Sequence, residues 1–246
     1  MPDHAAQLST PWLRVAQTAV VALSMLLPSR GAVAEAEPGA PDTMEARVLA
    51  CTACHGPQGQ GTSNEYFPRL AGKPVGYLYN QLVAFRDGRR RYPPMNYLLE
   101  FQPDPYLQKM AEYYAAQRPP GQAPGLLAAS QDTLAHGRAL VTGGAPDRGI
   151  PACSGCHGPA LTGMEPAIPG LVGLKPTYIS AQLGAWRYGT RTAAAPDCMQ
   201  MVASLLTESD VTAVAAWLSS LAVPADPSPA PRGTFAMPLP CGSEPN

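Results

Sequence analysis

The sequence predicts an all-α fold with two similar domains in tandem. Three observations lead to this prediction: a pentapeptide that occurs twice, a longer repeat at an offset of 101 residues, and apolar residues at helical spacing inside the repeated segments. A duplication explains this order better than composition does. We therefore expect two copies of one small helical unit.

The repeated pentapeptide has the form Cys-x-x-Cys-His, at residues 51–55 and 153–157. This pattern is typical of covalent haem c attachment, in which both thiols add to the haem vinyl groups and the histidine binds the iron. Zinc binding and dithiol chemistry are the alternatives, but four thiolates and two histidines exceed one tetrahedral zinc site. We predict two haem c groups, held by Cys51, Cys54 and His55 and by Cys153, Cys156 and His157.

Residues 1–34 predict an export signal. Arg14 precedes a mostly apolar stretch from Val15 to Leu27, and Ala34 fits the position before signal-peptidase cleavage. The alternative is a membrane helix, but the apolar run is shorter than the roughly 20 residues that span a bilayer. We expect a periplasmic protein that begins at Glu35, with membrane association only if the segment is not cleaved.

Helix signals follow in the same order in both copies. Short opening helices are expected at residues 44–50 and 132–141, and longer ones at 77–88 and 178–189, each ending at a glycine. The last helix of the first copy begins after Asp104-Pro105, and that of the second copy begins at a capping box, Thr207 to Asp210.

Composition places the boundaries between these units. A Pro- and Gly-rich stretch after Arg118 interrupts regular structure and predicts a linker. The expected organisation is a signal peptide at 1–34, domain 1 at 35–118, a linker at 119–131, domain 2 at 132–223 and a Pro-rich tail at 224–246. Domains this small bury little apolar surface, so an enclosed porphyrin would complete each core.

Met95 and Met201 are the candidates for the second axial iron ligands. A histidine and a methionine sulfur are a usual pair for an electron-transfer haem c. Each methionine follows the glycine-terminated helix of its copy and precedes the last helix. Aligning Leu99 with Leu205 sets Met95 opposite Met201, so we choose Met201 over Met199.

Further residues have weaker signals. A carbonyl at Pro68 or Pro169 could accept a hydrogen bond from the neighbouring haem histidine, although either proline could be a plain turn residue. His136 is expected on the surface. The arginines Arg86, Arg89, Arg90 and Arg91, with Arg187 and Arg191 in the second copy, either end a solvated helix or pair with haem propionates.

These elements, repeated in order, resemble the bacterial diheme cytochromes c of the c-four type. The shared elements are Cys-x-x-Cys-His, Pro-x-Leu-x-Gly, Tyr-x-x-x-Gln-Leu-x-x-Phe/Trp-Arg-x-Gly, a loop methionine and a capped helix, over about residues 42–222. The resemblance implies two class I cytochrome c domains with His/Met ligation, packed so that their haems exchange electrons. The first copy departs from the pattern at Pro93-Pro94 and at residues 101–103.

Two cysteines remain after haem attachment. Cys198 lies three residues before Met201, and Cys241 lies in the Pro-rich tail. In an oxidising compartment we expect a mutual disulfide, the alternative being two unrelated thiols.

The leading hypothesis is a periplasmic diheme cytochrome that carries single electrons between redox proteins, with no catalytic residues and no small-molecule substrate. Its expected partners are a dehydrogenase or quinol-oxidising complex upstream and a terminal oxidase or reductase downstream. The formal net charge of −1 argues against nucleic acid. One alternative is the haem subunit of a dehydrogenase complex, for example with a flavoprotein. A diheme peroxidase would need a displaceable sixth ligand, and the methionines argue against it.

Overall fold

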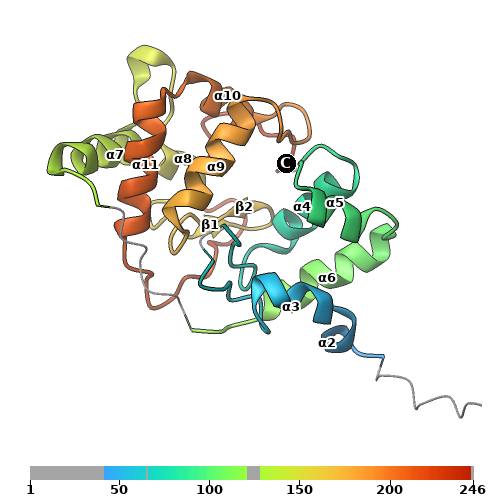
Figure 1. Cartoon of the computed structure of the whole chain (residues 1–246). Coiled ribbons are helices and arrows are strands. Elements are labelled where there is room, and N and C mark those ends of the chain that lie inside the picture. The colour runs from blue at the N-terminus through green and yellow to red at the C-terminus, as the bar shows by residue number, and fades with distance from the viewer. Residues whose placement is uncertain (1–41, 65, 121–127, 245–246) are drawn as a thin grey trace, which may run out of the picture. The chain divides into compact units, whose positions relative to one another are not determined.

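Helices form nearly all of the regular structure in this computed structural model, which describes residues 42–64, 66–120 and 128–244 (Figure 1). The predicted signal peptide and most of the predicted linker lie outside the described residues. Residues 41–246 form one compact unit. Within the described residues, strands occur only as a short antiparallel hairpin, β1 (Gly163–Met164) with β2 (Ile168–Pro169). The predicted all-α class is confirmed.

The helices of the first copy are α2 (Met44–Arg47), α3 (Leu49–His55), α4 (Val75–Arg86), α5 (Pro93–Leu99) and α6 (Asp104–Ala116). Those of the second copy are α7 (Gln131–Gly143), the 3-10 turn η2 (Pro146–Arg148), α8 (Cys153–His157), α9 (Pro176–Arg187), α10 (Cys198–Leu205) and α11 (Glu208–Ser220).

The helix ends follow from local chemistry. The Ser130 side chain accepts from the Thr133 amide at the start of α7, and prolines occupy the first turn of α5, α6 and α9. The capping box predicted at Thr207 is present, because Thr207 and Asp210 each accept from the other's backbone N–H.

The second copy builds its core where α7 crosses α11, and Figure 1 shows these two helices side by side. Gly137 lies at the crossing. A Cβ atom at this position would lie 2.1 Å from the carbonyl oxygen of Ala213, so only glycine permits this approach. Fully buried Val141 and Leu218 fill the contact. In the first copy, α6 packs against α4 around Leu107 and Leu78.

The tail after Leu221 has no helix in its described part but is held at several points. Ala230 exchanges backbone hydrogen bonds with Gly163 and Glu165. Farther on, Cys241 forms a disulfide with Cys198, which agrees with the predicted pairing. The tail is therefore attached to the second copy at two separate places.

No single helix in the described part of the chain combines the length and hydropathy of a membrane span. The bent pair α10 and α11 reaches the length and apolar composition of a span only when the two helices are counted together.

Asp210 joins three elements of the second copy. Its carboxylate is 2% exposed and accepts hydrogen bonds from Arg148 at 2.9 Å and from His136 at 2.8 Å, besides capping α11. His136 is about half exposed, as expected, but it has this structural partner. Burial raises the pKa of this carboxyl, but the bonds from Arg148, Thr207 and His136 outweigh it and hold the pKa well below its usual range.

We expect Asp210→Asn to lower the free energy of unfolding at pH 7 by about 1–2 kcal/mol, since it weakens a cap and two charge-assisted hydrogen bonds. The folded-state pKa is depressed, so the contribution is present above the unfolded pKa of about 3.9 and is lost as pH falls through the folded value. Urea unfolding followed by circular dichroism measures both effects. Exposed Asp132→Asn is the control, and an equal loss there would contradict the assignment.

Candidate haem-binding site

Each Cys-x-x-Cys-His motif forms a short helix that directs its histidine inward. His55 ends α3 and His157 ends α8, and both are 7% exposed. The Nδ1 atom of His55 lies 3.0 Å from the carbonyl oxygen of Pro68, and that of His157 lies 2.8 Å from that of Pro169. Nδ1–H donates to the carbonyl, which leaves Nε2 as the free ligand atom. The predicted role of both proline carbonyls agrees with this geometry.

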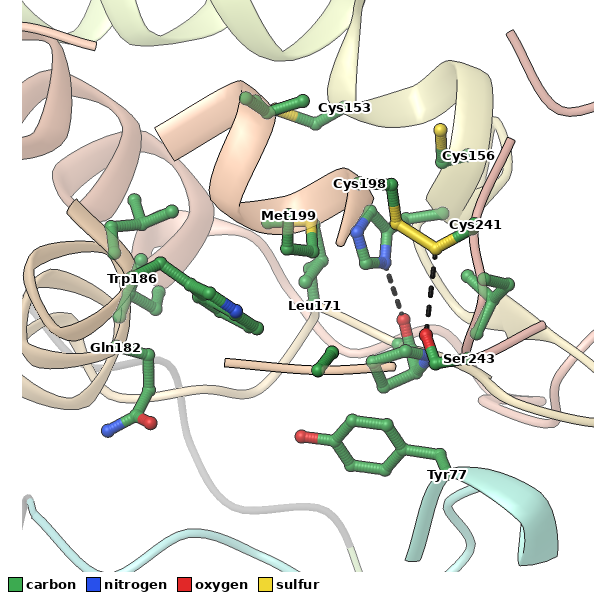
Figure 2. A pocket seen from close by; sticks show the side chains of 18 of the residues that line it. Tyr77, Cys153, Cys156, Leu171, Gln182, Trp186, Cys198, Met199, Cys241 and Ser243 are labelled. Atoms are coloured by element: carbon green, nitrogen blue, oxygen red, sulfur yellow. Dashed lines mark hydrogen bonds between the residues drawn. A yellow bond between two sulfur atoms is a disulfide. The ribbon is translucent and has the colours of Figure 1, made fainter. Parts of the chain in front are cut away.

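Each motif opens into a separate cavity, and side chains of the other copy complete both linings. Cys51, Cys54, His55 and Met95 line the first, whose volume is about 750 Å³. The second cavity, of about 150 Å³, is lined by the other motif's three residues and by Met199. Figure 2 shows Met199 directed into the second cavity from α10, with Cys198 and Cys156 nearby.

The pKa shifts of the motif cysteines and histidines suit haem attachment better than a reactive dithiol. Burial raises the pKa of Cys51 and Cys156 and raises that of Cys153 to about 11. A dithiol redox centre depends instead on a thiol of lowered pKa. Desolvation lowers the pKa of His55 and His157, which keeps both imidazoles neutral and able to bind iron.

The structure places the predicted ligand Met201 outside the second cavity. Met201 is 47% exposed and does not line the second cavity, whereas Met199 packs against the core. The prediction of Met201 depends on pairing Leu99 with Leu205. An offset of 104 residues instead aligns the first residues of α6 and α11. It also pairs buried Leu99 with buried Ala203 and exposed Tyr97 with exposed Met201. In this alignment, Met95 corresponds to Met199.

Unpaired buried donors fit a porphyrin in each cavity. Among the described residues, the Tyr114 hydroxyl and the Trp186 indole N–H are buried without a hydrogen-bond partner. Tyr114 lines the first cavity and Trp186 the second. An orphaned buried donor is costly, and a carboxylate-bearing group in the second cavity would satisfy Trp186, whereas Tyr114 lies beside the Cys51 thiol. These residues, the thiols and the two neutral histidines together match the chemistry of haem c.

A symmetric polar network lies where the two cavities meet. Arg90 donates to Gln182 at 2.8 Å and to Tyr178 at 2.9 Å, and it also reaches Gln81 of its own copy at 3.0 Å. Arg191 makes the equivalent contacts to residues 81, 77 and 182. The backbones of Arg90 and Arg191 also form an antiparallel bridge. Figure 2 shows Tyr77 and Gln182 facing each other across the cavity.

This network brings buried positive charge to the boundary. Arg90 is 8% exposed and Arg191 is 4% exposed, and their partners in the network are neutral side chains. Desolvation also lowers the pKa of Lys73, which lines both cavities, to about 8. Buried cations need a compensating charge. Haem propionates directed toward this boundary would supply it.

Other arginines in the predicted cluster have surface partners. Arg86 pairs with Asp87 and Asp104, so it does not match the proposed propionate contact. The Arg187 guanidinium lies over the Tyr188 ring. Arg90 and Arg191 were expected only as members of this cluster, and their hydrogen bonds between the two copies were not predicted. Tyr77, Gln81 and Arg90 each have an identical residue 101 positions later, and this repetition could have indicated the network.

Within the described residues, no group of three or more His, Cys, Asp and Glu side chains is arranged to hold a metal ion.

The protein-family model for cytochrome c matches two segments of the chain, residues 46–119 and 135–222. The chain belongs to the cytochrome c family. It is 36% identical to a thiosulfate dehydrogenase electron acceptor of Thiomonas intermedia (strain K12) over 77% of this chain and 87% of that protein. It is also 36% identical to cytochrome c4 of Pseudomonas aeruginosa over 72% of this chain and 86% of the relative.

Solved structures give the same result. Reduced recombinant cytochrome c4 from Pseudomonas stutzeri matches with a TM-score of 0.63 and 32% identity, over 72% of this chain and 96% of that one. The thiosulfate dehydrogenase TsdBA from Marichromatium purpuratum matches with a TM-score of 0.65 and 32% identity, over 73% of this chain and 40% of that one. The resemblance to the c-four type is thus confirmed.

These matches establish the cofactor and the general function. This cytochrome has two tandem class I domains and two covalently bound haem c groups, and its activity is electron transfer rather than catalysis. The haems supply one-electron Fe(III)/Fe(II) chemistry, and the protein holds and orients them.

We expect Arg90→Gln to lower the reduction potential of the first haem, because a buried positive charge favours the ferrous state. Coulomb's law at an effective dielectric constant near 20 gives a shift on the order of 70 mV for a unit charge about 10 Å from a redox centre. Spectroelectrochemical titration measures the potential. Arg89→Gln, at a more exposed position of the same loop, is the control, and equal shifts in both variants would contradict the role of the network.

Proposed function

We propose that this chain is an exported electron carrier in which His55 and Met95 hold one iron and His157 and Met199 hold the other. The observation that supports this proposal is that each cavity is lined by one attachment motif and by the methionine of the helix before the last one, Met95 in α5 or Met199 in α10, with the histidine fixed by a proline carbonyl. Met110 and Met237 also contribute to the linings. Six-coordinate iron with unchanged ligands in both redox states suits electron transfer.

The side chains around each site support this role. Leu183, Val202 and Leu218 surround the second cavity with apolar atoms, and Leu78, Leu82 and Leu99 do so in the first. An apolar enclosure excludes water and limits rearrangement of charge when the iron changes oxidation state. The Arg90 and Arg191 network anchors both copies at the point where the two cavities meet.

An oxidising compartment is the expected location. Haem c attachment and the Cys198–Cys241 disulfide both belong outside the cytoplasm. The predicted signal peptide at residues 1–34 agrees with a periplasmic location. Upstream partners would be a dehydrogenase or a quinol-oxidising complex, and downstream partners a terminal oxidase or reductase.

A second candidate is the electron-accepting subunit of a dehydrogenase. Two relatives at 36% identity, from Thiomonas intermedia and Stutzerimonas stutzeri, are thiosulfate dehydrogenase electron acceptors. In this form, the donor would be a sulfur-oxidising enzyme that remains bound or docks repeatedly.

The ligand assignment predicts different outcomes for two nearby methionines. Met199→Ala should remove about half of the sulfur-to-iron charge-transfer band in the far-red spectrum of the oxidised protein and lower one reduction potential, because thioether ligation favours ferrous iron. Met95→Ala should remove the other half. Met201→Ala is the matched control, and a loss of the band in that variant with retention in Met199→Ala would restore the sequence-based choice.

Purification of the native protein under mild conditions tests carrier against subunit. A free carrier should elute as a haem protein without a stoichiometric partner. Co-purification of an equimolar catalytic subunit that reduces both haems when given its substrate would favour the second candidate.

A further inference from the structure

The methionine helix of the second copy is attached to the Pro-rich tail by a covalent bond. Cys198 is the first residue of α10 and directly precedes Met199, and its sulfur is bonded to that of Cys241 (Figure 2). The segment that leads into α10 is attached as well, because the Gly242 amide donates to the Pro196 carbonyl at 2.9 Å. Movement of the start of α10 therefore requires movement of the tail.

The tail approaches this segment so closely that only glycine fits at position 242. A Cβ atom there would lie 2.2 Å from the carbonyl oxygen of Ala195 and 2.7 Å from that of Ala194. Two stretches of main chain are thus in direct contact, next to the disulfide. The two contacts together fix the first residue of α10 and the three residues that precede Asp197.

The tail has further anchors away from α10. Asn80 of α4 donates to the Ser243 carbonyl at 3.0 Å, and the Ala167 amide donates to the Glu244 carboxylate at 3.0 Å. Every second side chain of the tail is half-buried, and four of these line the second cavity: Met237, Leu239, Cys241 and Ser243. The tail is therefore a packed wall of the cavity and resists displacement by α10.

The first copy fixes its methionine helix with a side chain instead. Asn96 directly follows Met95 in α5. Its amide group donates to the carbonyls of Phe85 and Arg90, the latter at 2.9 Å, and its oxygen accepts from the Tyr92 amide at 2.8 Å. Each copy thus has a different attachment beside the methionine that lines its cavity.

We propose that the tail from Phe235 to Glu244 positions Met199, and that the Cys198–Cys241 disulfide sets how often this sulfur leaves the second iron. This inference rests on the proposed ligand role of Met199. With the disulfide intact, departure of the sulfur disrupts the contacts of the tail. Without it, α10 moves independently of the tail, so Met199 leaves more often and the reduction potential of the second haem falls. Asn96 has the corresponding role for Met95.

The test is an imidazole titration of the oxidised, full-length diheme protein at pH 7, followed by the far-red band of methionine-bound iron. Imidazole binds the sixth position only after the methionine has left it, so its apparent Kd falls as the open population rises. In the Met95→Ala background the band reports the second iron alone, and in the Met199→Ala background it reports the first iron alone.

The serine pair Cys198→Ser/Cys241→Ser should lower the imidazole Kd of the second iron by roughly tenfold or more, since it removes a cross-link over a long loop. The Kd of the first iron should change by less than about twofold, because it lies in the other copy. Asn96→Ala is the matched variant and should give the reverse result. Gly242→Ala keeps the disulfide and should shift only the second iron, by a smaller factor.

Opening of the disulfide in the mature protein separates positioning from folding. Wild type that is reduced with dithiothreitol, alkylated with iodoacetamide as verified by mass, and reoxidised with ferricyanide should bind imidazole as the serine pair does. Unchanged binding at the second iron in both proteins, or equal tightening at both irons, would overturn the positioning role. Full retention of the band in Met199→Ala would instead show that the proposed ligand is wrong.

Discussion

The structure depends on enclosure of a haem by a chain segment too short to form a complete core. Each copy has only a few helices, which pack in pairs and also border a cavity. The attachment helix, the proline carbonyl and the methionine segment are positioned around that cavity. Covalent attachment through two thiols makes the porphyrin part of the fold, so packing and redox function are properties of the same contacts.

The junction between the two cavities has a second constraint, which is electrostatic. Arg90 and Arg191 are buried, and each reaches across to glutamine and tyrosine side chains of the other copy. The duplication places the same three residue types on both sides, so one network satisfies both copies. Because the partners of both arginines are neutral, this region would accommodate the anionic propionates of the haems.

The tail makes two otherwise similar copies different. Both have a glycine after the haem histidine and a methionine in the helix before the last one. Only the second has a disulfide-anchored segment along its cavity, within the residues that the structure describes. The surroundings of the two attachment motifs therefore differ although the motifs are the same.

The sequence by itself determined the features that depend on local spacing: two attachment motifs, the helix signals with the capping box at Thr207, and the pairing of the two remaining cysteines. Tertiary structure decided the others. Met199 and Met201 lie two positions apart and so project from different sides of α10, and only packing shows which side faces the cavity. Arg86 and Arg90 belong to one charged run, yet one pairs with surface carboxylates and the other is buried at the junction. Burial and long-range contact separate these cases, and neither can be obtained from spacing along the chain.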